Sequence, residues 1–304
     1  MNVLSLFDGI SCGKIALERA NISIDKYYSS EIDEYAISIS KKNYPDIIRL
    51  GNVINWRNWN IDWGSIDILI GGSPCQGFSF AGKQLNFNDY RSKLFFEYVD
   101  ILNHIKHYNK NIIFLLENVC MKSEYINVIS NLLNVKPIMI DSAMFAVAHR
   151  HRLYWTNFKI RLPKYWNPIN FDDINTGDTN WLDDSIIERI KKWNAYQKPI
   201  ESATIIGNKS KLPCLIAKGY NQLHSGMILI SDGVKYRYLT NNEAELSMTL
   251  PIDYTKGISD KQRAKCIGNG WTVDVIAYIF SELKNQIDNN SIITNKLNNY
   301  KKLF

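Results

Sequence analysis

The chain has 304 residues, of which 45% are hydrophobic and 22% charged, enough apolar content for one large core or for a core with a smaller appended domain. It contains no run of about eighteen apolar residues, and its first residues include no basic segment, so we expect neither a membrane span nor a signal peptide, and we expect a cytoplasmic location. The formal charge of +6 is modest for this length and permits a polyanionic partner without requiring one.

Short apolar runs alternate with helical patterns through the first half of the chain, which indicates an α/β fold with a parallel sheet. Strands are predicted at residues 2–7, 27–30, 66–71, 111–117, 137–141 and 152–158. Helices are predicted at residues 14–20, 34–43, 94–105 and 124–133, where apolar residues recur at helical spacing.

The alternation stops in the middle of the chain. Residues 159–238 hold twelve Lys and Arg against eight Asp and Glu, with tryptophans among turn-forming residues. We expect an insertion here, which divides the chain into residues 1–158, 159–236 and 237–304. Composition alone fits a lid or a structural subdomain as well as it fits a region that binds a nucleic acid. A last helix at residues 276–287 is expected to return to the sheet, and the chain beyond Asn285 is expected to fray.

Glycines follow the first predicted strand, in the segment Phe7-Asp8-Gly9-Ile10-Ser11-Cys12-Gly13. They let a ligand approach the backbone, and the next helix offers free N–H groups. The spacing is not G-x-G-x-x-G, which argues against a dinucleotide pyrophosphate. Glu31 or Asp33, after the second strand, is placed to bind ribose hydroxyls. Together these features predict a nucleoside-bearing cofactor without a diphosphate; a purely structural turn is the alternative.

A thiol and a carboxylate stand at the ends of two predicted strands. Cys75 follows Gly-Ser-Pro, and Glu117 follows an apolar run. Alone, Cys75 fits an inert buried thiol and Glu117 a helix cap, but a charge directly after a buried strand is costly unless it faces a polar cleft. A thiolate beside an acid suits attack on an unreactive ring carbon, and a pyrimidine is the obvious ring.

The remaining cysteines and the histidines are not expected to bind metal. The five cysteines are widely spaced and form no C-x-x-C, which argues against disulfides and zinc clusters. His149 and His151 are two residues apart without further nearby ligands, which favours surface or structural roles. The cysteines expected to serve only in packing are Cys12, Cys120, Cys214 and Cys266.

The motifs, taken in order, resemble those of the DNA (cytosine-5) methyltransferases nearly from end to end. The matching blocks are Phe7 to Gly13, Glu31-Ile32-Asp33, Gly51-Asn52-Val53, Ser73-Pro74-Cys75-Gln76, Glu117-Asn118-Val119, His149-Arg150-His151-Arg152, Arg237-Tyr238-Leu239-Thr240 and Gly268-Asn269-Gly270-Trp271-Thr272-Val273. The histidine-containing block is closer to the animal de novo enzymes than to bacterial ones, which begin it with Gln. The resemblance implies a Rossmann-like class I S-adenosylmethionine-dependent methyltransferase domain, with residues 159–236 as a small inserted target-recognition domain.

The resemblance also implies roles for individual residues. Catalytic roles fall on Cys75, Glu117, Arg150 and Arg152. Contacts with S-adenosyl-L-methionine fall on Phe7, Asp8, Gly9, Ile10, Gly13, Glu31, Ile32, Asn52, Val53, Ser73, Pro74, Asn269 and Thr272. Contacts with DNA fall on Gln76, Ser79, Arg237 and Thr240. The chain departs from the family pattern at Asn52, where Asp is usual, at Ala81, and at Trp271, where a small or apolar residue is commoner.

The implied reaction is methylation of C5 of a cytosine flipped out of a duplex. Cys75 would add to C6 of the base while Glu117 donates a proton or a hydrogen bond to the ring N3. After methylation, loss of the C5 proton would release Cys75. Arg152 would hold the base O2 and Arg150 a phosphate or the catalytic loop, with residues 78–88 as a moving cover.

The implied partner is double-stranded DNA, in a restriction-modification or phage protection system with or without a cognate restriction endonuclease, and we expect a monomer. Three alternatives share the fold. An RNA cytosine methyltransferase would carry its own recognition signature, which we do not find. A catalytically dead DNA-binding regulator predicts loss of Cys75 or Glu117, and a free-nucleotide methylase leaves the basic insertion without a purpose.

Overall fold

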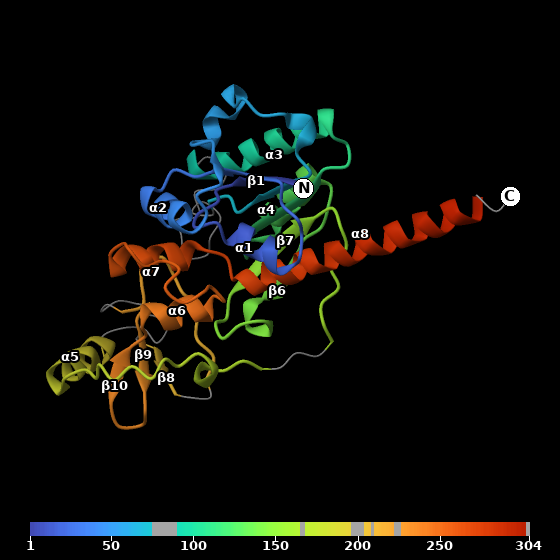
Figure 1. The fold of residues 1–304 in the computed structure, drawn as a ribbon. Coiled ribbons are helices and arrows are strands. Elements are labelled where there is room, and N and C mark those ends of the chain that lie inside the picture. The colour runs from blue at the N-terminus through green and yellow to red at the C-terminus, as the bar shows by residue number, and fades with distance from the viewer. Residues whose placement is uncertain (75–89, 165–167, 196–203, 208–209, 222–225, 302–304) are drawn as a thin grey trace.

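A central sheet carries the structure, a computed structural model that describes residues 1–74, 90–164, 168–195, 204–207, 210–221 and 226–301 (Figure 1). The sheet has seven strands in the order β3-β2-β1-β4-β5-β7-β6. The strands are β1 (Asn2–Leu6), β2 (Lys26–Ser30), β3 (Ile48–Arg49), β4 (Ile68–Gly71), β5 (Ile113–Val119), β6 (Ile138–Asp141) and β7 (His151–Thr156). The predicted α/β, Rossmann-like architecture is confirmed.

One strand runs against the others. Neighbours from β3 to β5 pair in parallel, but β7 is antiparallel to both β5 and β6. The prediction of a parallel sheet is therefore wrong at β7. The connection from β6 to β7 spans only residues 142–150, too few for the crossover that a parallel pair requires. As a result, the beginning of β7 lies at the same edge of the sheet as the carboxyl ends of β1, β2, β4 and β5.

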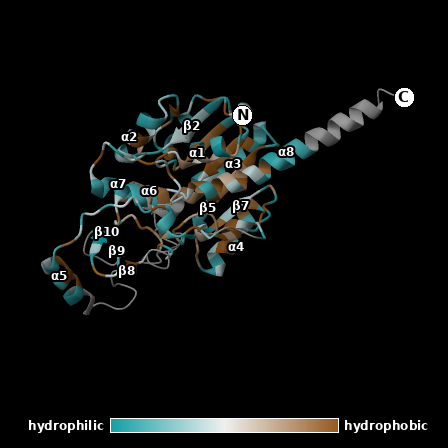
Figure 2. Cartoon of the chain, turned by 60° about the horizontal axis from the view of Figure 1, so that its bottom comes forward, coloured by the Kyte–Doolittle hydropathy of each residue, from teal (hydrophilic) through white to brown (hydrophobic). Residues whose placement is uncertain are grey.

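Helices cover both faces of the sheet. On one face lie α1 (Cys12–Arg19), α2 (Glu34–Asn43) and α8 (Val273–Lys301), and on the other α3 (Tyr90–Tyr108) and α4 (Ser123–Leu133). Successive residues of β1 alternate between the two cores, because Val3 packs in one and Leu4 in the other. Figure 2 shows hydrophobic residues gathered on the sheet and on the helix faces that cover it. Short 3₁₀ helices lie at Val53–Asn58, Trp63–Ser65, Ser142–Met144 and Phe171–Asp173.

The last helix is longer than predicted. α8 continues to Lys301, and the expectation of fraying beyond Asn285 stays a prediction. Residues 286–301 contain neither Gly nor Pro, the two residues that end helices most effectively. In Figure 1 the end of α8 projects away from the rest of the molecule. Even so, none of the helices in the described residues is both long and apolar enough to span a membrane.

The middle of the chain forms a separate lobe beside the main sheet (Figure 1). It contains α5 (Asp184–Ala195) and a second sheet, ordered β10-β9-β8, from β8 (Thr204–Ile206), β9 (Ile228–Ser231) and β10 (Tyr236–Tyr238). Ile190 of α5 packs against Met227 and Leu229 in a small core of its own. The chain then returns through α6 (Asn241–Ser247) and α7 (Asp260–Asn269) to α8.

Parts of residues 159–236 nevertheless pack with the main domain. Leu212 is fully buried in the main core; its backbone N–H donates to Val147 O at 3.1 Å, and its carbonyl accepts from His149 N at 2.9 Å. At Gly268 of α7, an added Cβ would lie 2.4 Å from the carbonyl carbon of Ile216, so only glycine allows this close approach. The predicted domain borders stay a prediction, but the inserted segment is anchored well inside them.

The chain between β7 and the lobe is fastened to α8. The Lys159 N–H donates to Gln286 Oε1 at 3.3 Å, and the Arg161 N–H donates to Glu282 Oε2 at 3.2 Å. Tyr278 Oη donates to the Arg161 carbonyl at 2.6 Å. These bonds lie at the edge of the sheet where β7 ends.

Candidate active site

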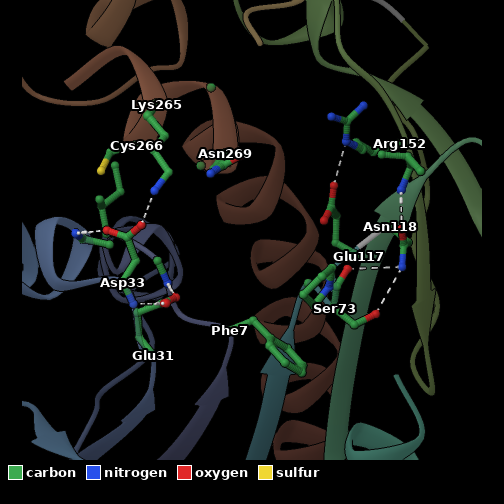
Figure 3. A pocket seen from close by; sticks show the side chains of 18 of the residues that line it. Phe7, Glu31, Asp33, Ser73, Glu117, Asn118, Arg152, Lys265, Cys266 and Asn269 are labelled. Atoms are coloured by element: carbon green, nitrogen blue, oxygen red, sulfur yellow. Dashed lines mark hydrogen bonds and ion pairs between the residues drawn. The ribbon is translucent and has the colours of Figure 1, made fainter. Parts of the chain in front are cut away.

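A cavity of about 310 Å³ opens where β1, β2, β4 and β5 end and β7 begins (Figure 3). Ligands of doubly wound sheets bind at this edge, and ligand pockets commonly measure about 300–1,000 Å³. The cavity is lined by Phe7, Gly9, Ile10, Glu31, Asp33, Ala36, Gly72, Ser73, Pro74, Glu117, Asn118, Val119, Arg150, Arg152, Lys265, Cys266, Gly268, Asn269 and Gly270. The predicted residues after four separate strands thus meet in one place.

The turn after β1 has a left-handed backbone at Phe7 and Ser11, with φ of 57° and 61°. Non-glycine residues rarely adopt this conformation, and it persists only where surrounding contacts hold it. Asp8 provides those contacts. Its carboxylate accepts hydrogen bonds from four hydroxyls, at 2.6 to 2.9 Å, on Ser5, Ser11, Tyr27 and Ser29. The expected cofactor contact of Asp8 is therefore corrected: its side chain points inward and holds the turn, and burial raises its pKa although the hydroxyls oppose the rise.

Two acids after β2 face the cavity. Glu31 accepts three backbone N–H groups, from Gly9 at 2.8 Å, Ile32 at 2.7 Å and Asp33 at 2.8 Å. Asp33 caps α2 and binds Lys265 Nζ of α7 at 2.5 Å (Figure 3). Burial alone would raise the pKa of Asp33, but the hydrogen bond from Lys265 lowers it. The sequence left Glu31 and Asp33 as alternatives; both line the cavity, and Lys265 was not predicted.

Some residues expected to contact the cofactor do not line the cavity. They are Asp8, Gly13, Ile32, Asn52, Val53 and Thr272. Val53 and Thr272 are buried, with exposed fractions of 4% and 2%, so packing occupies their side chains. Asn52 Oδ1 accepts the Ile54 N–H at 3.1 Å and caps a 3₁₀ helix. The side chain of Ile32 is 66% exposed.

Glu117 is a nearly buried carboxylate of the cavity. Only 8% of the residue is exposed, and each carboxylate oxygen lies close to a side-chain nitrogen. Arg152 Nε lies 2.9 Å from Oε1, and Trp271 Nε1 lies 3.1 Å from Oε2. Figure 3 shows Arg152 of β7 directed at Glu117 of the neighbouring strand β5. The structure therefore brings together the predicted carboxylate and guanidinium, and adds an indole that was not assigned a role.

Arg150 has a different environment from Arg152. It is 6% exposed, and its Nη1 donates to the Leu215 carbonyl at 3.3 Å. This bond ties the beginning of β7 to the inserted segment.

Outside the cavity, His149 and His151 stack with ring centroids 6.3 Å apart, and both lie within ion-pair distance of Asp141. This arrangement fits a structural role, and no group of metal-binding side chains occurs in the part of the chain that the structure describes.

Asn118 holds the backbone that leads into the predicted nucleophile. Its Nδ2 donates to Ser73 Oγ at 3.2 Å, and Ser73 is buried (Figure 3). Sequence reasoning quoted Asn118 only as part of a block and missed this contact. Cys75, Gln76, Ser79 and the expected cover at residues 78–88 lie outside the described residues.

Burial makes three of the other cysteines poor nucleophiles. It raises the pKa of the Cys12 and Cys266 thiols to about 12, and it also raises the pKa of Cys120. Because the thiolate is the reactive form, these thiols suit packing, as predicted. Cys75 remains the candidate nucleophile.

Arg237, expected to contact DNA, is buried against Glu243 of α6. Thr240 is the partly exposed N-cap of the same helix, and its expected DNA contact stays a prediction. Arg237 is 2% exposed and binds both oxygens of the fully buried Glu243, at 2.7 and 2.8 Å. Thr240 Oγ1 accepts the Glu243 N–H at 3.2 Å, and Glu243 Oε2 accepts the Thr240 N–H at 3.0 Å, which makes a capping box for α6. A structural role therefore fits Arg237 better than the expected DNA contact, because its charged end is buried and paired with Glu243.

Arg237→Met is expected to lower the free energy of unfolding by about 3–5 kcal/mol, because it leaves the Glu243 carboxylate buried without its partner. Burial alone would raise the pKa of Glu243, yet its hydrogen bonds, chiefly from Arg237, keep it below the ordinary 4.5. The pair's contribution should therefore be present above about pH 4.5 and be lost as the pH falls further. Urea denaturation at several pH values measures both effects.

The matched control for Arg237→Met is Arg57→Met, which removes two ion pairs of a half-exposed arginine, with Glu97 and Asp100. That change should cost less than about 1 kcal/mol. Weakened DNA binding by Arg237→Met with unchanged stability would contradict the structural role.

Three comparisons place the chain among known proteins. The family model described as C-5 cytosine-specific DNA methylase matches residues 1–178 and 164–285. Type II methyltransferase M1.ScrFI of Lactococcus lactis subsp. cremoris is 26% identical over 308 residues, which cover 92% of this chain and 77% of that protein. Type II methyltransferase M.NgoBV of Neisseria gonorrhoeae is 38% identical over 120 residues, 38% of this chain but only 27% of that protein. The solved structure of Entamoeba histolytica methyltransferase EhMeth has the same fold, with a TM-score of 0.71, 20% identity, and coverage of 94% of this chain and 98% of that one.

Proposed function

Because the chain belongs to the C-5 cytosine-specific DNA methylase family, we propose that it transfers the methyl group of S-adenosyl-L-methionine to C5 of cytosine in double-stranded DNA. The observation that carries the proposal is the Glu117 carboxylate, held by Arg152 at the cavity edge, one strand away from the backbone that leads into Cys75. We propose that this carboxylate and the Cys75 thiol act on one ring.

The cavity suits a nucleoside-bearing cofactor. Phe7, Gly9 and Ile10 line one wall, and the Glu31 carboxylate lines the same cavity. A carboxylate offers about four acceptor positions, and Glu31 uses three for backbone N–H groups, which leaves one for a ribose hydroxyl. Bound S-adenosyl-L-methionine supplies an electrophilic methyl group. We propose no metal in this reaction.

The chemistry requires activation of the base, because C5 of cytosine is a poor nucleophile. Addition of the Cys75 thiolate to C6, with Glu117 holding a proton or hydrogen bond at N3, turns C5 into an enamine carbon that can attack the methyl group. Loss of the C5 proton then expels Cys75. We propose that Arg152, which pairs with Glu117, holds the base O2. Flipping the base out of the duplex costs about a few kcal/mol of stacking.

The lobe of α5 and β8 to β10 is proposed to choose the DNA sequence. It stands beside the cavity domain as a separate unit with its own small core, and residues 159–238 are net basic. Similarity to Type II methyltransferases fits a role in restriction-modification or phage protection, with or without a partner endonuclease. We propose that the chain acts in the cytoplasm as a monomer.

The direct test is genome-wide bisulfite sequencing of a host that lacks cytosine methylation, with and without this chain. The expected result is new 5-methylcytosine confined to one short motif. Soluble, folded protein that leaves no mark on DNA contradicts the proposal. Labelled methyl transfer to tRNA would then identify an RNA enzyme.

Exchange of the recognition segment is expected to change the methylated motif, since base contacts specify a sequence and phosphate contacts only position the protein. A graft between residues 159 and 236 should retain Phe171, Leu212 and Tyr220, because these side chains belong to the main core. Bisulfite sequencing of the chimaera gives its motif. A graft from a relative of the same specificity serves as the control, and an unchanged motif in the other chimaeras places sequence readout elsewhere.

A further inference from the structure

Trp271 lies between α7 and α8 and reaches the carboxylate of Glu117, 154 residues away in the chain. Its indole Nε1 donates to Glu117 Oε2 at 3.1 Å. The ring is partly buried against the main core. The contact therefore connects the C-terminal part of the domain with the end of β5.

Two glycines make room for the indole. A Cβ added at Gly72 would lie 3.0 Å from Trp271 Nε1 and 2.9 Å from Glu117 Oε2. A Cβ added at Gly13 would lie 3.4 Å from Trp271 Cζ3. Gly72 follows β4 and Gly13 belongs to α1, so the indole occupies a slot between the turn before the predicted nucleophile and the first helix.

We propose that Trp271 is a positioning residue that fixes the orientation of Glu117 for its work on the target base. The inference rests on the proposed function. Arg152 of β7 forms an ion pair with one carboxylate oxygen, and Trp271 donates a hydrogen bond to the other. Side chains from two separate parts of the chain thus define the plane of the carboxylate. Hydrogen bonds to an ionised acceptor are stronger and more directional than neutral ones. The oxygens keep lone pairs for the cavity, which Glu117 also lines.

A carboxylate with only one fixed oxygen would rotate about its terminal bond, because this torsion is broad in Glu. Catalysis by a proton at the ring N3 depends on hydrogen-bond geometry, so rotation should reduce the rate of the chemical step more than it reduces binding. Loss of the indole N–H should therefore appear in kcat and leave substrate affinities nearly unchanged.

The test is Trp271→Phe, which keeps an aromatic ring in the slot but removes the N–H. We expect kcat for DNA methylation to fall about tenfold, the size typical for loss of a hydrogen bond to a charged group. The cofactor and DNA dissociation constants should stay within about twofold of wild type. The matched control is Trp56→Phe, which also removes an indole bond to a carboxylate, Glu97 Oε2 at 2.8 Å, but outside the cavity. Its kcat should be that of the wild type.

A double-mutant cycle with Glu117→Gln shows whether Trp271 acts through Glu117. In single-turnover assays, Trp271→Phe should have almost no effect in the Glu117→Gln background. An equal effect in both backgrounds, or a wild-type kcat for Trp271→Phe, overturns the inference. Absence of methylation by the wild-type protein is a different result, which rejects the proposed function itself.

Gly72→Ala tests the same contact without altering the indole, should Trp271→Phe fail to fold. The added methyl group would press on both Trp271 Nε1 and Glu117 Oε2 and separate them. The same fall in kcat with retained cofactor affinity supports the inference, and wild-type kcat overturns it.

Discussion

Replacing Cys75 by serine is expected to abolish methyl transfer and to leave DNA binding intact. The covalent step needs a thiolate at C6, and a serine hydroxyl is far less ionised at neutral pH than a thiol. Transfer of labelled methyl groups to duplex DNA measures the first effect, and a gel-shift titration of the same variant measures the second.

The control for Cys75→Ser is Cys120→Ser. Burial raises the pKa of the Cys120 thiol, which therefore stays protonated and has no expected part in the reaction. This variant should methylate DNA at the wild-type rate. Turnover near wild type by Cys75→Ser would exclude the covalent mechanism.

Glu117→Gln is expected to lower kcat by about 10²- to 10⁴-fold, the usual contribution of a general acid or base. The environment makes the amide a poor substitute. Arg152 Nε lies 2.9 Å from one carboxylate oxygen and Trp271 Nε1 donates to the other, so the NH₂ of a glutamine must face one of these two nitrogens. Steady-state kinetics with a cognate duplex measures kcat, and calorimetric titration checks that the cofactor still binds.

Glu18→Gln is the matched control, because Glu18 is an exposed carboxylate near the end of α1 and does not line the cavity. It should retain the wild-type kcat. A loss of less than about tenfold in Glu117→Gln would show that proton transfer at the base does not depend on this carboxylate.

The sequence predicted the elements whose buried residues form a regular apolar pattern along the chain. The apolar runs located β1, β2, β4 and β5, and polar residues directly after them marked the edge where the cavity lies. Glu117 could be selected from the sequence because a charge after a buried strand needs a polar environment. The spacing of apolar residues and the free-energy cost of burying a charge were sufficient to predict these features.

Features set by distant partners could not be predicted in this way. The direction of β7 depends on its pairing with β5, and the burial of Arg237 depends on Glu243 and on the core around it. The sequence equally allowed an exposed arginine that contacts DNA. The bond from Trp271 to Glu117 joins residues with no local relation, and only packing around Gly72 and Gly13 brings them together.

The reversed direction of β7 also affects how the protein tolerates changes in length. β7 enters the sheet beside the cavity and leaves it at the opposite edge, where α8 holds the chain at Lys159 and Arg161. Changes in length between Arg161 and Leu212, where the inserted segment contacts the chain before β7 again, are therefore expected to leave the strand that carries Arg152 in place. Helix α8 fixes the backbone that follows β7. We therefore expect evolutionary changes in the length of the lobe to leave the geometry of the cavity unchanged.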